Sequence, residues 1–220
     1  MTSRTRRVPP RTVAIAAVLA ATSLAGCATN INDMLGELEH GDPAAARDVV
    51  VEIGEYLRAK ELARQDFDAA DREALAYLGE LARKGPDPTV RATAISNLAA
   101  IRSHDGTRIF VEALGDDSAP WVVRLDAAQA LALRPAADAA EPLARALRNE
   151  GRIEVVLSII SALRATRGPF AEMALLDAFL DGGPRFESSR LALHDALRDI
   201  TGKELPFRDL KAWREYRETR

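Results

Sequence analysis

The sequence predicts an all-α protein, an α-α superhelix of about four to five stacked helix pairs closed by a C-terminal capping helix. Two observations support this fold class. First, apolar residues make up 47% of the 220 residues and aromatic residues only 5%; the apolar content is mostly Ala and Leu, which favours closely packed helices over sheets. Second, related segments recur about every 33 residues, which is typical of repeat architectures.

One set of segments carries an apolar stripe at the same place in every repeat. The segments align without gaps and begin 33, 32 and 34 residues apart. Their two matched positions lie four residues apart, so they share one face of a helix. The segments are residues 90–101, 123–134, 155–166 and 189–200, and the matched positions are Leu98, Leu131, Leu163 and Leu197 together with Ala94, Ala127, Ile159 and Leu193.

A second set of segments alternates with the first at the same spacing, and in each the last matched apolar position is followed by Asp, Asn or Gly, which favour turns. We therefore expect two helices of about three turns in each repeat, and neither can bury its apolar face alone. The β-branched run at residues 153–160 also fits a buried strand, but its place in the repeat favours a helix. The second set comprises residues 106–117, 139–150 and 171–182, with Leu114, Leu147 and Phe179 at matched positions.

Residues 70–200 resemble the HEAT repeat family in its short bacterial form. The run Asp-Pro-Thr-Val-Arg at residues 87–91 is the best match, and Asp117, Val123 and Arg124 match next best. In that family the helix that opens with Val-Arg forms the inner, concave layer, and its Arg pairs with an Asp of the turn to build a ladder between units. Val156 replaces this Arg in the third unit, so we expect an interruption there. The ladder residues implied by the resemblance are Asp87, Arg91, Asp117, Arg124 and Arg190. The residues themselves also predict that Asp87, directly before Pro88, is the N-cap of its helix.

The repeats are expected to span residues 43–200, with residues 43–84 as a degenerate first pair that has an enlarged loop. Residues 201–220 are predicted to cap the open end, because the pattern breaks after residue 200 and Asp209 can begin a last helix. This tail is similar to the closing segment of many bacterial HEAT-repeat proteins. We assign Trp213 to packing in this cap, with ligand stacking as the alternative.

The N-terminus predicts a lipoprotein signal peptide over residues 1–26. A basic stretch without acids is followed by a short apolar run at residues 13–21 and by Leu24-Ala25-Gly26-Cys27, the order found in secretory signals. The apolar run is shorter than the roughly 20 residues that a membrane span needs. The last four residues resemble the lipobox of bacterial lipoproteins, which implies lipidation and cleavage at Cys27. The alternative is an ordinary buried cysteine after a chance run of small residues.

The lipoprotein resemblance also predicts where the protein resides. Residues 27–42 would be a lipid-anchored tether containing a short helix. Ala28 follows the cysteine where an Asp tends to retain lipoproteins in the inner membrane. We therefore favour the inner leaflet of the outer membrane, facing the periplasm.

Charge and cysteine content exclude several function classes. The formal net charge is −3, and without the four Arg of the predicted leader the remaining 26 basic and 33 acidic residues leave −7. Such an acidic body argues against nucleic-acid binding, which requires a concentrated basic face. The single cysteine excludes an internal disulfide and a cysteine-based zinc site. We expect no cofactor and no metal.

Small polar side chains are predicted to line the exposed, concave side of the Val-Arg helices. They recur at equivalent positions but include no large anchor of the kind that dominates binding energy. Trp121, beside Pro120, is either such an anchor for a partner or part of the core. The predicted surface consists of Thr93, Ser96, Asp126, Gln129, Ser158, Ser161 and Asp195.

The sequence does not predict a catalytic or metal site. His40, His104 and His194 fall in different elements, and the run Ser103-His104-Asp105 cannot form a triad by itself, since neighbours in sequence lack the geometry. The acidic run at residues 66–71 lacks the Gly and terminal Glu of a calcium loop, so we assign it to a loop and an N-cap.

We therefore expect a non-enzymatic interaction scaffold or adaptor in the bacterial cell envelope, attached to the membrane through Cys27. Its partner would be another envelope protein, whose identity the sequence does not give. The alternative is a ligand-handling protein or accessory enzyme subunit, like the bilin lyases and oxidoreductase-associated proteins that have HEAT-like repeats.

Overall fold

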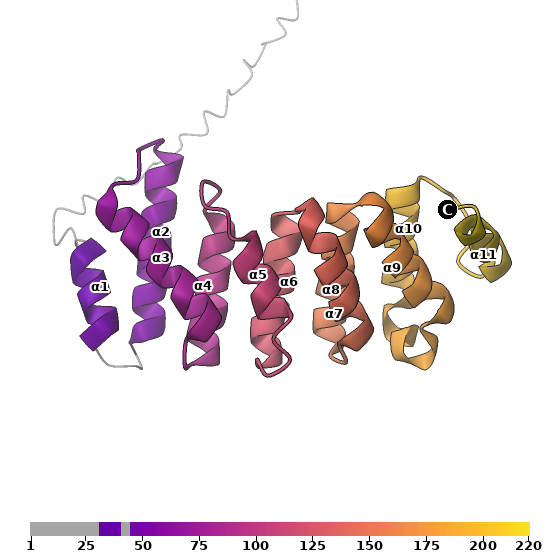
Figure 1. Cartoon of the computed structure of the whole chain (residues 1–220), viewed down its shortest axis with the longest axis horizontal. Helices are drawn as coiled ribbons and strands as arrows, with labels where there is room; N and C mark the ends of the chain where they lie inside the picture. The colour runs from indigo at the N-terminus through magenta and orange to yellow at the C-terminus, as the bar shows by residue number, and fades with distance from the viewer. Residues whose placement is uncertain (1–30, 41–44) are drawn as a thin grey trace, which may run out of the picture. The chain divides into compact units, whose positions relative to one another are not determined.

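Eleven α-helices and two short 3-10 helices make up the residues that the computed structural model describes, 31–40 and 45–220 (Figure 1). The predicted signal peptide and Cys27 lie outside these residues. No helix in the described ranges is both long and apolar enough to cross a membrane. The helices are α1 Ile31–His40, α2 Ala46–Leu62, α3 Ala69–Lys84, α4 Pro88–Ala100, α5 Thr107–Leu114, α6 Trp121–Leu133, α7 Ala140–Asn149, α8 Ile153–Thr166, α9 Gly168–Asp181, α10 Arg190–Thr201 and α11 Leu210–Glu218, with 3-10 helices η1 Ala137–Ala139 and η2 Gly183–Ser189.

The helices of the unit from Ile31 to Arg220 form two layers. Helices α2, α4, α6, α8 and α10 pack on one another in this order and are called the even layer here. Helices α1, α3, α5, α7, α9 and α11 do the same and form the odd layer. Each odd helix from α1 to α9 also packs on the even helix that comes after it, giving five pairs arranged in chain order (Figure 1). The all-α solenoid is confirmed, with five pairs and one additional helix.

The predicted apolar stripe forms the core of the even layer. All eight matched positions of α4, α6, α8 and α10 have no exposed surface. The β-branched run that also fitted a strand lies in α8, where Val155, Val156, Ile159 and Ile160 are buried. Packing against both neighbours thus prevails over the local β preference of these residues.

The solenoid begins earlier than the sequence predicted. Ile31, Met34 and Leu35 of α1 are buried in the same core as α2 and α3, so α1 is part of the first pair and not of a tether. The pair expected over residues 43–84 is therefore divided: α2 belongs with α1, and α3 belongs with α4. The prediction was wrong because α1 is short. Its apolar residues recur over little more than two turns, too few for the sequence pattern to mark it as part of a repeat.

The acidic run before α3 serves as a helix cap, as the sequence predicts. Asp68 and Asp71 each accept a hydrogen bond from the other's backbone N–H, at 3.1 and 2.8 Å, forming a capping box. Asp71 is fully buried and also pairs with Lys60 of α2. These contacts fix the loop between the first two pairs.

The far end of the stack is closed by α11. Asp209 caps this helix by accepting a hydrogen bond from the N–H of Ala212. Trp213 is fully buried, and its ring lies 6.0 Å from that of Phe179 on α9 and 5.8 Å from that of His194 on α10. Trp213 thus closes the core, in agreement with the capping interpretation.

An ion-pair ladder joins the middle units, but its acidic members differ from those predicted. Arg91 pairs with Asp116 at 3.3 Å and Arg124 with Glu150 at 2.7 Å. Asp87 caps its own helix, as its place before Pro88 predicts, by accepting hydrogen bonds from the N–H groups of Thr89 and Val90, and it does not pair with Arg91. The turn presents Asp116 to Arg91, and not the predicted Asp117, which comes next in the chain. Asp117 makes no hydrogen bond or ion pair with any described residue.

Arg190 does not join the ladder, because the fifth pair is followed by the segment that carries α11 and not by a turn that offers an acid to it. Its guanidinium lies over the rings of Phe179 and Phe207, 5.3 and 5.9 Å from their centroids. Its one ion pair is with Glu187 of the adjoining η2, at 3.7 Å. The capping segment therefore supplies aromatic rings where an earlier unit supplies an acid.

The predicted interruption at Val156 is present, and a different arginine bridges it. Val156 is buried among apolar side chains. Arg185 of η2 reaches back to the C-terminal end of α7 and donates hydrogen bonds to the carbonyls of Leu147, Arg148 and Glu150. In the ladder, an Arg of one pair contacts an acid of the following pair, whereas here an Arg of the fifth pair contacts the preceding, fourth pair.

Glu150 is the most highly connected residue of the ladder. Besides Arg124, its carboxylate accepts hydrogen bonds from the N–H groups of Gly151 and Arg152, at 2.9 and 2.8 Å. Burial acts to raise the pKa of Glu150, but the hydrogen bonds from Arg124 and Arg152 outweigh it and hold this pKa below its usual value. The negative charge is therefore stable in the fold.

We predict that Arg124→Ala lowers the free energy of unfolding by about 2–4 kcal/mol, because it leaves a buried carboxylate without its cation. Arg91→Ala should cost less, since the side chain of Asp116 is 33% exposed and that of Glu150 only 6%. Urea denaturation followed by circular dichroism measures both. Arg108→Ala is the control, because its exposed pair with Glu112 contributes at most about 1 kcal/mol.

The same pair should respond to pH. A carboxylate whose pKa is lowered on folding stabilises the protein above its unfolded pKa of about 4.3, and this stabilisation is lost as the pH falls through the folded value. The stability difference between the wild type and Glu150→Gln should therefore narrow in acid. A difference that stays constant from pH 7 to the acid limit of folding would contradict the assignment.

Candidate functional site

The seven predicted surface residues all lie on the even layer, and the structure brings most of them together. Ser96 of α4 donates a hydrogen bond to Asp126 of α6. Gln129 of α6 lines a surface cavity with Ser158 and Ser161 of α8. The remaining two, Thr93 and Asp195, are engaged within their own helices: the Thr93 hydroxyl donates to a carbonyl of α4, and Asp195 lies 3.8 Å from the neighbouring His194.

Asp126 is an unusual carboxylate for a protein surface. It is half-buried, and burial raises its pKa above the usual value, while the hydrogen bond from Ser96 opposes this only in part. No cationic side chain of the described ranges pairs with it. A cationic group brought to this surface would therefore stabilise the ionised form of Asp126.

The cavity between α6 and α8 has a volume of about 290 Å³. Ala132 and Leu133 complete its lining, so apolar walls face the hydroxyl and amide groups of the predicted residues. Leu133 is 73% exposed. The groove thus offers mainly apolar contact to a ligand.

The exposed aliphatic side chains of this layer were not predicted. Leu133, Leu157 and Leu191 each lie two residues from a buried stripe position, which places them about 200° around the helix from the core. Leu157 is 41% and Leu191 63% exposed. Projecting the other leucines as well as the polar residues would have found them, and they add large apolar side chains to a surface that was predicted to carry only small polar ones.

Trp121 lies neither in the core nor in a turn. It is the first residue of α6 and is 36% exposed. The guanidinium of Arg152, from the turn before α8, lies 4.7 Å from its ring centroid. The core alternative was wrong, because the side chain is among the exposed apolar ones and the guanidinium of Arg152 lies over its ring.

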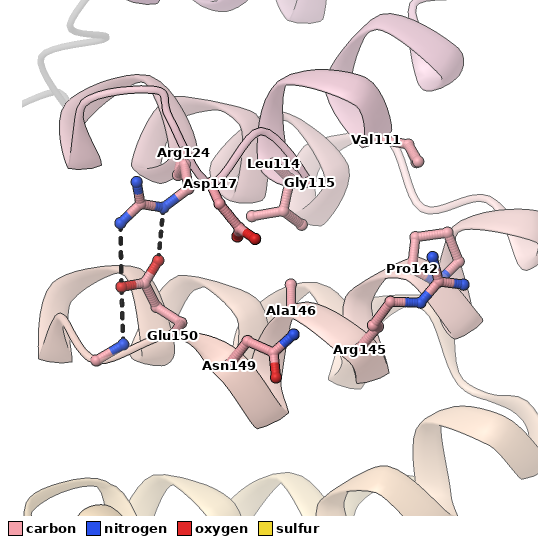
Figure 2. Close-up of a pocket in the computed structure, with 11 residues that line it drawn as sticks. Val111, Leu114, Gly115, Asp117, Arg124, Pro142, Arg145, Ala146, Asn149 and Glu150 are labelled. Atoms are coloured by element: carbon pink, nitrogen blue, oxygen red, sulfur yellow. Dashed lines mark hydrogen bonds and ion pairs between the residues drawn. The ribbon is translucent and has the colours of Figure 1, made fainter.

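A second cavity, of about 380 Å³, lies between α5 and α7 of the odd layer and was not predicted (Figure 2). The Arg124–Glu150 pair forms part of its wall, and Asp117 and Asn149 project into it from the two sides. Its lining comprises Val111, Leu114, Gly115, Asp117, Arg124, Pro142, Arg145, Ala146, Asn149, Glu150 and Gly151.

The run Ser103-His104-Asp105 is a structural loop, as expected. Glu61 accepts hydrogen bonds from the N–H of Ser103, at 2.6 Å, and of the residue before it. Arg134 donates to the carbonyl of His104 at 2.8 Å, and Asp105 accepts from the N–H that begins α5. Burial, together with Arg134, lowers the pKa of His104. Within the described ranges, no three side chains of His, Cys, Asp or Glu are grouped to hold a metal ion.

Comparison with known proteins bears on the repeats. A family model for HEAT repeats matches residues 31–132, from the first residue of α1 almost to the end of α6. No curated protein matches the chain. The match covers the first three helix pairs, and the later pairs continue the same two layers. Together, the match and the all-α solenoid support a HEAT-repeat protein.

Proposed function

We propose that this chain is a non-enzymatic scaffold that binds another protein through the even layer and is attached to the bacterial cell envelope by a lipid on Cys27. HEAT repeats commonly serve as protein-interaction scaffolds. The main support from this chain is the groove between α6 and α8, where apolar and hydrogen-bonding side chains lie side by side without a covering element.

The energetics of this surface favour a protein partner. Burying a leucine side chain fully contributes about 1.5–3 kcal/mol, so covering Leu133, Leu157 and Leu191 would stabilise a complex substantially. The small polar side chains between them leave room for a partner's backbone and offer it hydrogen bonds. Asp126 adds specificity, since a partner's cation would gain an unpaired acid.

The proposed anchor depends on the sequence before α1. The residues Leu24-Ala25-Gly26-Cys27 resemble a lipobox, and two or three acyl chains hold a protein stably at a membrane. Only three residues separate Cys27 from Ile31, which allows at most about 14 Å of extended chain. A lipidated protein would therefore present its solenoid close to the membrane. Ala28 supports location in the outer membrane.

We predict that a photo-crosslinking amino acid at Ser158 captures a defined protein in intact envelopes. The same amino acid at exposed Glu73 of α3 should not capture it, because α3 belongs to the odd layer. Leu133→Ser combined with Leu157→Ser should abolish the capture with only a small loss of stability, since neither side chain is in the core. Phe170→Ser is the matched control, because this apolar side chain is 65% exposed on α9 of the odd layer.

Two results would count against the even layer as the binding surface. One is equal capture from positions 158 and 73. The other is equal loss of capture in the Phe170→Ser control and in the double variant.

We predict that Cys27→Ser moves the protein from the membrane to the soluble fraction, because the thiol is the proposed site of acylation. Fractionation and immunoblotting measure this. Ala28→Asp is a matched variant that should keep the protein in membranes but shift it to the inner membrane. Unchanged membrane association of Cys27→Ser would disprove the lipid anchor while leaving the scaffold proposal untouched.

A further inference from the structure

The cavity between α5 and α7 contains a carboxylate that the fold does not use. Asp117 is exposed and makes no hydrogen bond or ion pair with the described residues. It lies 33 residues, or one repeat, before Glu150. Asp117 is therefore the equivalent, in its own unit, of the acid that pairs with Arg124. The preceding Asp116 already pairs with Arg91. Asp117 is thus a second acid in its turn, and it extends toward α7, where Ala146 and Asn149 lie (Figure 2).

The other charges that line this cavity are already paired. Arg124 is bound to Glu150. Arg145 pairs with Glu141, one turn earlier on α7, at 3.2 Å. Asp117 is therefore the one charged side chain of the lining without a hydrogen bond or ion pair to the described residues, and its carboxylate acts only electrostatically on Arg124.

The end of α5 adds to this negative potential. Helix α5 ends at Leu114, which lines the cavity. The C-terminal end of a helix carries a partial negative charge and attracts cations. The end of α7, which also borders the cavity, is already bound by a cation, because the guanidinium of Arg185 donates hydrogen bonds to its carbonyls.

The remaining walls are apolar and suit an aliphatic chain. Val111 and Leu114 line the cavity from α5, and Pro142 and Ala146 line it from α7. A volume of about 380 Å³ equals that of about a dozen water molecules at roughly 30 Å³ each. A chain of four or five carbons with a terminal cation needs less space than this.

We propose that this cavity binds an aliphatic cation, an ammonium or guanidinium group on a short hydrocarbon stem. The carboxylate of Asp117 and the side-chain carbonyl of Asn149 would hold the cation, and the four apolar residues would contact the stem. The source is either a free small amine or the Lys or Arg side chain of another protein. This site is on the odd layer, so it is independent of the proposed scaffold surface.

Titration of the full ¹⁵N-labelled chain, followed by NMR, tests the proposal. The probes are n-pentylammonium, the peptide acetyl-Gly-Gly-Lys-Gly-Gly-amide and the same peptide with norleucine in place of lysine. Saturable shifts of the Gly115, Asn149 and Gly151 amides are expected with a cationic probe and not with the norleucine peptide. Tighter binding of the amine supports a free ligand, and tighter binding of the lysine peptide supports a protein side chain.

Variants locate the site. Asp117→Asn should weaken binding at least tenfold, the loss expected for a charge-assisted hydrogen bond. Ala146→Leu should weaken it by filling the stem region while keeping the charge. Asp138→Asn, at an exposed acid of η1 outside the cavity, should change the affinity less than twofold. No saturable shift with either cation, equal binding of the norleucine peptide, or equal loss in Asp138→Asn would overturn the proposal.

Discussion

Every helix pair of this chain depends on its neighbours, because the apolar stripe of a single pair cannot be buried within that pair. The matched stripe positions of α4, α6, α8 and α10 are fully buried only because the adjacent units cover them. The two ends must therefore be closed. Residues Ile31, Met34 and Leu35 of α1 close one end, and Trp213 of α11 closes the other. Stacking thus determines both where the solenoid starts and where it stops.

The apolar stripe is regular, but the polar contacts between units are not. Glu61 accepts backbone N–H groups at the first junction, ion pairs of Arg91 and Arg124 join the next two, and Arg185 reverses the direction at the fourth. A stack held by apolar burial tolerates this variety, since each polar contact needs only to satisfy its own buried groups. Irregular pairing leaves some acids without partners, and Asp117 is the clearest case.

Features that depend on the repeat period and on the face of a helix could be predicted from the sequence, whereas features that depend on a single residue could not. Periodicity indicated the fold class, the helix pairs and the layer that carries Ser96, Asp126 and Gln129. It could not choose between Asp116 and Asp117, because neighbouring acids in a turn differ in direction and not in type. The exposed Leu133 was missed because a leucine in a repeat is readily assigned to the core. The cavity between α5 and α7 was missed because it requires the packing of two helices.

The two surfaces differ in how they relate to the fold. Exposed leucines of the even layer contribute little to the stability of the solenoid, so a partner could cover them without altering the stack. The odd-layer cavity is lined by two successive units and by the Arg124–Glu150 pair that joins them. A ligand that bound there would contact both units and would bind the stacked state in preference to the separated one, so it would stabilise that junction. The same ion pair thus couples the packing of the repeats to the shape of the cavity.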